Sequence, residues 1–207
     1  MFRKLLLWWL SFTLIWGLFR LLNPSEVVSE LLAKPVIWLG IMLIGFKIGL
    51  LPRQIIIDLK EKYLQTKPVL TTLILPALSI TFYFLLINFR SVSIPQISFF
   101  SLVTILLINF ATGIVEEVVY RGILYVWLLK NASELTSFLL VQLLFLIGHL
   151  PILIIHSDSF ESSLTRALFI VLIGSAHTLV FRFTKSLYAS SLTHGIWNSL
   201  VNLFMLS

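Results

Sequence analysis

The sequence predicts an all-α, polytopic transmembrane helical bundle of about seven spanning helices. Of the 207 residues, 58% are hydrophobic and 12% are charged, and the mean hydropathy is +1.02. A soluble domain does not tolerate so apolar a composition on its surface. The apolar residues form long, continuous, leucine-rich runs, without the period-two alternation of a membrane β-barrel. Helices are therefore the expected spanning elements.

Each apolar run is interpreted as one spanning helix, because a crossing needs roughly 18 to 22 apolar residues. The runs cover residues 5–22, 35–51, 68–89, 99–129, 138–155, 164–183 and 186–206. A break in the fourth run near Arg121 would add an eighth helix, so the prediction extends from six to eight. No internal repeat is visible, and residues 1–207 are expected to form a single integral membrane domain with a motif-bearing core at about 99–206.

The first run is interpreted as a retained helix and not as a cleaved signal peptide. Arg3 and Lys4 precede it, as positive charges precede a signal sequence. The run is nevertheless long, contains three tryptophans and lacks a small-residue cleavage site, which are features of a permanent membrane helix.

The polar segments between the runs are interpreted as connectors. Residues 52–67 mix apolar and charged side chains, which supports an interfacial amphipathic helix and a solvated connector about equally. Residues 90–98 form a short polar loop with Pro95. Residues 131–137 and 156–163 are expected to be capping or turn segments.

The basic residues indicate the orientation of the chain in the membrane. With the N-terminus inside and seven crossings, ten fall on the cytoplasmic side: Arg3, Lys4, Lys47, Arg53, Lys60, Lys62, Lys67, Lys130, Arg182 and Lys185. Four fall on the other side: Arg20, Lys34, Arg90 and Arg166. This bias orients helical membrane proteins. The net charge of +6 is thereby explained without nucleic acid, and we expect a multi-pass protein with a cytoplasmic N-terminus, in the plasma membrane if the source is bacterial.

Three ionisable residues, Glu116, Glu117 and Arg121, lie inside the fourth apolar run. Placing one charged side chain near the bilayer centre costs roughly 2.5 to 3.5 kcal/mol of free energy. Charged residues inside a membrane therefore usually face a protein interior or a water-filled cavity. His149 and His194 also lie within predicted spans. At roughly 1.5 Å per residue from the cytoplasmic helix ends, Glu116, His149 and His194 lie about 21, 18 and 14 Å deep. These depths are compatible with one shared site.

Helical geometry suggests how the polar side chains divide their roles. Glu117 and Arg121 form an i,i+4 pair of opposite sign, which leaves Glu116 without a local partner. A carboxylate in an apolar cavity suits a general base acting on water. His149 is then expected to hold that water or to share its proton, and His194 with Asn198, one helical turn later, to donate hydrogen bonds to an oxyanion. Together these residues are the parts of a peptide-hydrolysing site.

Several polar residues also have purely structural interpretations. The pair of Glu117 and Arg121 satisfies buried charge without any catalysis. His177 is expected to have a hydrogen-bonded packing role, and Asn202 to be an interhelical contact. His156 is expected to be solvated in a loop. The aromatic residues, including Trp127 and Trp197, are expected to mark interfaces or packing.

Three motifs resemble one family of intramembrane proteases. They are Glu116-Glu117-x-x-x-Arg121, Phe145-x-x-x-His149 and His194-x-x-Trp197-Asn198. In order and spacing they resemble the CAAX prenyl endopeptidase and bacteriocin-processing (CPBP, or Abi) family, over about 109–202. The resemblance implies that Glu116 and His149 activate the water and that His194 and Asn198 form the oxyanion hole. Glu117 and Arg121 are then supporting residues.

Zinc is the alternative chemistry, because two histidines and a glutamate can ligate a catalytic zinc ion. The ligands would be His149, His194 and Glu116. The chain has no HExxH sequence and no cysteine, so a Cys-ligated metal, a thiolate nucleophile and disulfides are excluded. We expect a metal-independent glutamate site that requires no cofactor.

The leading hypothesis is an intramembrane endopeptidase that cuts a membrane-associated peptide near its cytoplasmic end, in a cavity open to the cytosol or, in addition, laterally to lipid. The resemblance implies either prenylated CAAX substrates or peptide maturation and immunity to bacteriocins. A second hypothesis is a non-catalytic bacteriocin-immunity or scaffold protein of the same fold. A third hypothesis is a proton-coupled transporter. The sequence shows neither the paired repeats nor the midplane helix breaks of such transporters.

Overall fold

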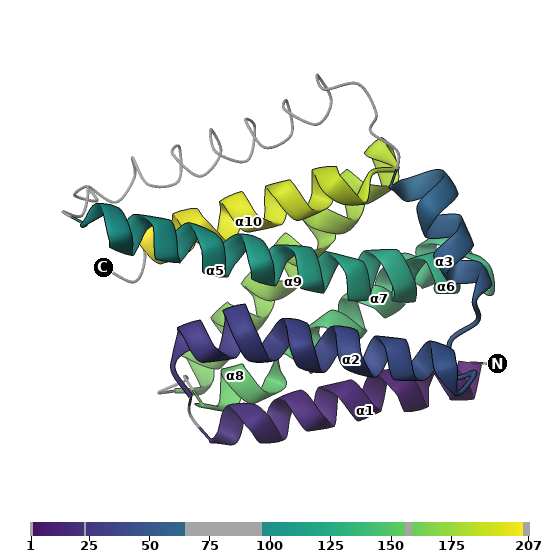
Figure 1. The fold of residues 1–207 in the computed structure, drawn as a ribbon, viewed down its shortest axis with the longest axis horizontal. Coiled ribbons are helices and arrows are strands. Elements are labelled where there is room, and N and C mark those ends of the chain that lie inside the picture. Colours follow the sequence, from purple (N-terminus) through teal and green to yellow (C-terminus); the bar gives the residue numbers. More distant parts are fainter. Residues whose placement is uncertain (1, 23, 65–96, 156–158, 205–207) are drawn as a thin grey trace.

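The computed structural model describes residues 2–22, 24–64, 97–155 and 159–204, and every regular element in these ranges is a helix. Figure 1 shows the arrangement. In chain order the helices are α1 (Phe2–Leu21), η1 (Val27–Ala33), α2 (Lys34–Lys47), α3 (Gln54–Asp58), η2 (Leu59–Tyr63), α5 (Phe99–Glu117), η3 (Val118–Tyr125), α6 (Val126–Leu129), α7 (Glu134–Gly148), α8 (Leu150–Ile155), α9 (Phe160–Thr184) and α10 (Leu187–Phe204). The η elements are π-helical turns. The predicted all-helical class is confirmed for the described residues.

Four of the described helices are long and apolar enough to cross a membrane: Arg3–Leu21, Val27–Lys47, Phe99–Leu129 and Phe160–Thr184. They agree with the first, second, fourth and sixth predicted runs, except that the second begins at Val27. The third run, 68–89, lies outside the described residues. The count of seven is therefore not confirmed, although the chain is an integral membrane protein with several apolar helices.

The fifth and seventh runs depart from the prediction for local reasons. A break at His149 divides 138–155 into α7 and the short α8, because Pro151, two residues later, lacks the backbone N–H that would continue the helix. Helix α10 has 18 residues, but buried polar side chains such as Ser190 and Thr193 make it less apolar than the other long helices. In contrast, the fourth run does not break at Arg121. Helices α5, η3 and α6 follow one another without a gap from Phe99 to Leu129.

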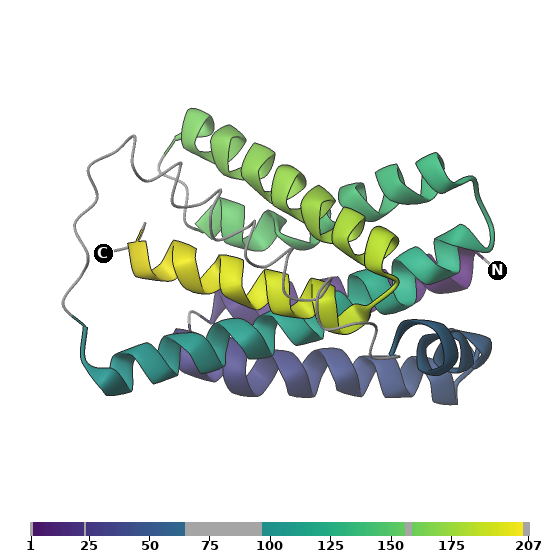
Figure 2. The ribbon, with the colours of Figure 1, turned by 90° about the horizontal axis from the view of Figure 1, so that it is seen from above.

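Helices α5 and α10 lie side by side along much of their length (Figures 1 and 2). Two glycines permit the close approach. A Cβ atom added to Gly113 would lie 2.9 Å from the backbone nitrogen of Gly195. A Cβ atom added to Gly195 would lie 3.1 Å from the Cα atom of Phe110. Small residues at a helix crossing let the backbones approach inside a membrane, and this crossing brings the two glutamates of α5 next to His194.

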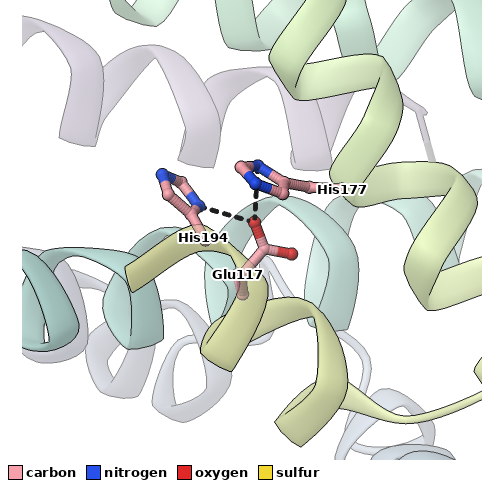
Figure 3. Close-up of side chains that lie close together, drawn as sticks. All are labelled: Glu117, His177 and His194. Atoms are coloured by element: carbon pink, nitrogen blue, oxygen red, sulfur yellow. Dashed lines mark hydrogen bonds and ion pairs between the residues drawn. The ribbon is translucent and has the colours of Figure 1, made fainter. Parts of the chain in front are cut away.

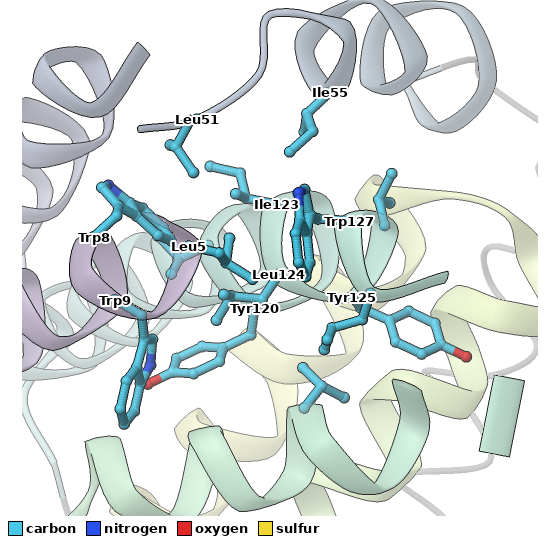
Figure 4. Close-up of a cluster of buried hydrophobic side chains, with 14 of the residues drawn as sticks. Leu5, Trp8, Trp9, Leu51, Ile55, Tyr120, Ile123, Leu124, Tyr125 and Trp127 are labelled. Atoms are coloured by element: carbon cyan, nitrogen blue, oxygen red, sulfur yellow. The ribbon is translucent and has the colours of Figure 1, made fainter. Parts of the chain in front are cut away.

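Buried aromatic side chains fix the N-terminal helix pair, α1 and α2, against η3 (Figure 4). Trp8 and Trp9 of α1 are almost fully buried, as are Tyr120 and Trp127 of η3 and α6. The ring of Trp38 in α2 lies 6.1 Å from that of Tyr120 in an edge-to-face arrangement. Such aromatic contacts stabilise helix packing. They matter inside a membrane because the hydrophobic effect does not drive helices together in lipid. The tryptophans described thus pack mainly in the protein interior.

The short helices α3 and η2 lie at one end of the bundle, where Asp58 pairs with two lysines. Ile55 is buried, while Ile56 and Ile57 are about half-exposed, as an amphipathic helix requires. Asp58 accepts a hydrogen bond from Lys130 and pairs with Lys62 at 3.1 Å. Residues 54–63 are thus helical, in agreement with the amphipathic interpretation of 52–67. The helix ends that carry the predicted cytoplasmic basic residues of the described ranges lie at this end, beside the N-terminus (Figure 1).

Candidate active site

The two adjacent glutamates stand where the geometry of the motif helix changes. Glu116 and Glu117 are the last residues of α5, and the π-helical turn η3 begins at Val118 and contains Arg121. Such turns widen a helix locally and are frequent at functional sites. Glu116, Glu117 and Arg121 are all buried, so the polar chemistry lies inside the protein and away from lipid.

Oε1 of Glu117 lies close to side chains of Arg121, His194 and His177, and Figure 3 shows the two histidines. This oxygen lies 2.7 Å from Nη1 of Arg121 and 2.8 Å from Nδ1 of His194. The Nδ1 atom of His177 lies 3.9 Å from the same oxygen, which is too long for a hydrogen bond. The predicted ion pair of Glu117 and Arg121 is confirmed, and Glu117 also holds a histidine of the motif set.

Arg121 ties the motif helix to α9. Its Nη2 atom donates to the carbonyl of Gly174 at 2.6 Å, and Nε donates to Thr178 Oγ1 at 3.1 Å. Its guanidinium also lies over the ring of Phe145, 4.8 Å from the centroid. A fully buried guanidinium with these partners is a structural element of the bundle, as the sequence-based interpretation also allowed.

Glu116 lies between a lysine and two histidines. Its Oε1 atom accepts a hydrogen bond from Nζ of Lys34 at 2.7 Å. Its Oε2 atom faces Nε2 of His194 at 3.6 Å and Nε2 of His149 at 3.9 Å. These two gaps exceed hydrogen-bonding distance, and a polar gap of this size is one that a water molecule can bridge.

The structure corrects the placement of Lys34. The sequence-based prediction put Lys34 and Arg20 at the non-cytoplasmic membrane surface, because hydropathy starts the second run at Pro35. Instead, the second spanning helix begins at Val27, and Lys34 is 4% exposed within it. Lys34 also pairs with Glu30, which lies four residues earlier. That i,i+4 pair was the signal in the sequence that could have identified Lys34.

A chain of polar contacts leads outward from Lys34. Glu30 accepts a hydrogen bond from Thr112 Oγ1 at 2.9 Å and pairs with Arg20 at 3.5 Å. Arg20 in turn pairs at 3.0 Å with Glu26, whose side chain is 61% exposed. The buried site is thereby connected to the surface at the end of α1.

The hydrogen bonds of the two motif histidines assign their tautomers. Nδ1 of His149 lies 2.7 Å from the carbonyl oxygen of Phe145, and a carbonyl only accepts, so Nδ1 carries the proton. Nδ1 of His194 likewise donates to the Glu117 carboxylate. In the neutral rings both Nε2 atoms are therefore acceptors, and both face Oε2 of Glu116.

Asn198 shares a cavity of about 200 Å³ with Glu116 and His149. The same cavity is lined by Lys34, Glu30, Arg20, Glu26, Asn109 and Asn202, among others. Asn202 donates to Asn109 Oδ1 at 2.9 Å, so its predicted interhelical contact is confirmed.

His177 packs against a residue of the motif set. Its ring stacks on His194, with centroids 4.3 Å apart and planes 17° from parallel. It is buried, but its Nδ1 atom has no hydrogen-bond partner among the residues that the structure describes. The predicted packing role is therefore confirmed, and Nδ1 does not supply the predicted hydrogen bond to any described residue. His156 lies outside the described ranges.

The described residues contain one group of side chains that could hold a metal ion, formed by Glu117, His177 and His194. One ligand atom from each lies within 4.8 Å of the others. This set differs from the expected zinc ligands His149, His194 and Glu116, because it is centred on Glu117 and not on Glu116. Arg121 already contacts the shared Oε1 atom, which places a positive charge beside any bound cation.

The fold and the site define a helical membrane protein with a buried cluster of glutamates and histidines. A model of the type II CAAX prenyl endopeptidase Rce1-like family matches residues 97–200, half of the chain, and the chain therefore belongs to this family of membrane proteases. The match includes the motif residues from Glu116 to Asn198 but not Lys34, Glu30 or Arg20. Comparisons with curated proteins and with solved structures found no match.

Proposed function

We propose that the chain is an intramembrane endopeptidase that hydrolyses a peptide bond of a membrane-associated substrate with a water molecule activated by Glu116. The observation that carries this proposal is the position of Glu116 Oε2. It faces Nε2 of His194 at 3.6 Å and Nε2 of His149 at 3.9 Å, and Glu116, His149 and Asn198 line one cavity.

The nucleophilic water is proposed to lie between Glu116 Oε2 and His149 Nε2, since both atoms accept hydrogen bonds. The water oxygen attacks the carbonyl carbon of the substrate and passes a proton to Glu116. A tetrahedral oxyanion forms, the bond from carbon to nitrogen then breaks, and the leaving amine takes the proton from Glu116. General-base catalysis of this kind contributes roughly 10² to 10⁴-fold.

His194 and Asn198 are the proposed donors to the oxyanion. Because Nδ1 of His194 already donates to Glu117, Nε2 can donate only from a doubly protonated ring. The adjacent Glu117 carboxylate stabilises that charge, as the carboxylate of a catalytic triad does. Glu117 is therefore proposed to support catalysis through His194, in addition to its pairing with Arg121.

The proposed orientation places the N-terminus in the cytoplasm, because basic residues gather at the end of the bundle that contains it. The cavity lies toward the other end. It is lined by Arg20 of the last turn of α1 and by Glu26 just after that helix. In this orientation the cavity opens away from the cytosol, opposite to the sequence-based expectation. A peptide exposed on the non-cytoplasmic side then suits the site better than a cytosolic prenylated protein.

The test is cleavage of a peptide library by the purified protein in nanodiscs, with products identified by mass spectrometry. Glu116→Gln keeps the shape of the side chain and removes the base, so we expect turnover to fall by roughly 10² to 10⁴-fold. Glu161→Gln, at an exposed glutamate of α9, is the matched control and should retain full activity. Activity of Glu116→Gln within a few-fold of the wild type would remove Glu116 from the base role.

A second variant tests the oxyanion donors. Asn198→Ala should lower kcat by roughly 10² to 10³-fold, as removal of one oxyanion donor does elsewhere, with KM nearly unchanged. An increase in KM alone would make Asn198 a substrate-binding residue. If the wild type cleaves no member of the library, the non-catalytic immunity or scaffold role becomes the better interpretation.

A further inference from the structure

Lys34 makes the shortest contact of Glu116 with another helix. Its ammonium group donates to Glu116 Oε1 at 2.7 Å and pairs with Glu30 on its own helix. The rings of Trp16 and Trp38 flank it, with centroids 5.3 and 5.2 Å from Nζ. A lysine held by two carboxylates and two aromatic faces has little freedom to move.

The contact with Lys34 gives the two carboxylate oxygens of Glu116 different surroundings. Lys34 holds Oε1, so the carboxylate cannot rotate without breaking a buried, charge-assisted hydrogen bond. Oε2 is thereby kept toward the Nε2 atoms of His149 and His194. Without Lys34, either oxygen of Glu116 could turn toward the cavity or toward His194.

We propose that Lys34 is a positioning residue for Glu116, supplied by the second helix of the chain and fixed in turn by Glu30 and Arg20. This inference rests on the proposed function, in which Glu116 is the base. Lys34 lies outside the region matched by the family, residues 97–200. The N-terminal helix pair is then part of the active site, and the core at about 99–206 does not form the site alone.

Enzyme kinetics test the positioning role in the full-length chain in nanodiscs. Lys34→Met removes the ammonium group and keeps an unbranched apolar side chain. We expect kcat to fall by about 10²-fold, because small misplacements of reacting groups cost that much, while KM changes little. Lys34→Arg keeps a buried donor and should recover at least part of this loss. Lys60→Met, at an exposed lysine of η2, is the matched control.

A merely structural role gives a different result. The Lys34→Met protein would then be less stable, but its folded fraction would turn over at the wild-type kcat, and that outcome would overturn the proposal. Failure of Lys34→Arg to recover any activity would also count against it, because the donor and its charge would still be present.

A stability measurement tests the pairing even if no substrate is found. Lys34→Met leaves Glu116 buried without its cation, so adding Glu116→Gln should raise the melting temperature above that of Lys34→Met alone. A double variant no more stable than Lys34→Met, including one that does not fold, would overturn the pairing itself. Absence of peptide cleavage by the wild type, together with a recovered melting temperature, would instead contradict only the proposed function.

Discussion

His194 donates from Nδ1 to Oε1 of Glu117 at 2.8 Å, which directs its other nitrogen, Nε2, toward Glu116. The two adjacent glutamates thus lie on opposite sides of one imidazole ring. Neighbouring side chains on a helix point about 100° apart. The ring of His194 faces both glutamates, because Nδ1 contacts Glu117 and Nε2 faces Glu116. This arrangement gives a physical reason for two consecutive glutamates. Glu117 sets the orientation and tautomer of His194, and Glu116 faces the cavity.

Arg121→Ala should damage stability at least as much as activity. The substitution leaves Glu117 buried without its guanidinium partner and also removes the bonds to Gly174 and Thr178. Breaking a buried pair costs roughly 3 to 5 kcal/mol in other proteins. Thermal unfolding in detergent should therefore show a lowered melting temperature and a poor yield. Arg166→Ala, at an exposed arginine of α9, is the control. Normal folding of Arg121→Ala with loss of catalysis alone would place Arg121 among the catalytic residues.

The absence of cysteine allows a direct test of orientation. Glu26→Cys places a thiol at the exposed rim of the cavity, and Lys60→Cys places one at the opposite, basic end. In intact bacterial cells, a membrane-impermeant maleimide should label Glu26→Cys and should label Lys60→Cys only after lysis. The reverse labelling pattern would show that the cavity opens to the cytosol.

The stability that the Asp58 ion pairs contribute at the basic end of the bundle should decrease in acid. The hydrogen bond from Lys130 lowers the pKa of Asp58 below its ordinary value of 3.8; burial opposes this shift, and Lys62 adds to it. A lowered folded-state pKa stabilises the protein above the unfolded value, and that stability is lost as the pH falls through the folded value. Asp58→Asn should therefore lower the melting temperature by a constant amount above about pH 4, and the difference should shrink at lower pH. Glu161→Gln is the control, and a difference that does not change with pH would contradict this assignment.

The sequence identified those parts of the site that depend on local pattern. Glu116, Glu117 and Arg121 were evident because charge inside an apolar run is costly, and the i,i+4 geometry correctly paired Glu117 with Arg121. Similar helical depth brought His149 and His194 toward Glu116. Lys34 was missed because hydropathy places the boundary of a span at its first charged residue. Lys34 is stabilised inside the bundle by Glu30, four residues earlier, and by Glu116, 82 residues away along the chain.

The helix count and the position of His177 beside the site could not be predicted from local pattern. Hydropathy predicted a spanning helix at 186–206, but α10 is not among the described helices that are apolar enough to span, and polar side chains such as Ser190 and Thr193 are buried inside the protein. His177 contacts the site through ring stacking on His194, and no sequence spacing encodes a contact between the faces of two separate helices.

Zinc content separates the two chemistries that this cluster of side chains allows. A metal bound through Oε1 of Glu117 and Nδ1 of His194 would have to displace contacts that both atoms already make, although Oε2 of Glu117 and Nδ1 of His177 have no hydrogen-bond partner among the described residues. Oε1 of Glu117 accepts from Arg121 and His194, and Nδ1 of His194 carries a proton. A dication would also lie beside the Arg121 guanidinium. We therefore predict no stoichiometric zinc by elemental analysis, and activity that survives prolonged treatment with phenanthroline.

His177→Phe supplies the matching variant, because phenylalanine keeps the stacking on His194 and cannot ligate a metal. In a metal-independent site its kcat should remain within about tenfold of the wild type, since no step of the glutamate mechanism passes through His177. In a zinc site the variant should lose the ion and, with it, the nucleophile. One tightly bound zinc per chain, lost in His177→Phe, with wild-type activity restored only when metal is added back after chelation, would make Glu117, His177 and His194 ligands and overturn the role assigned to Glu116.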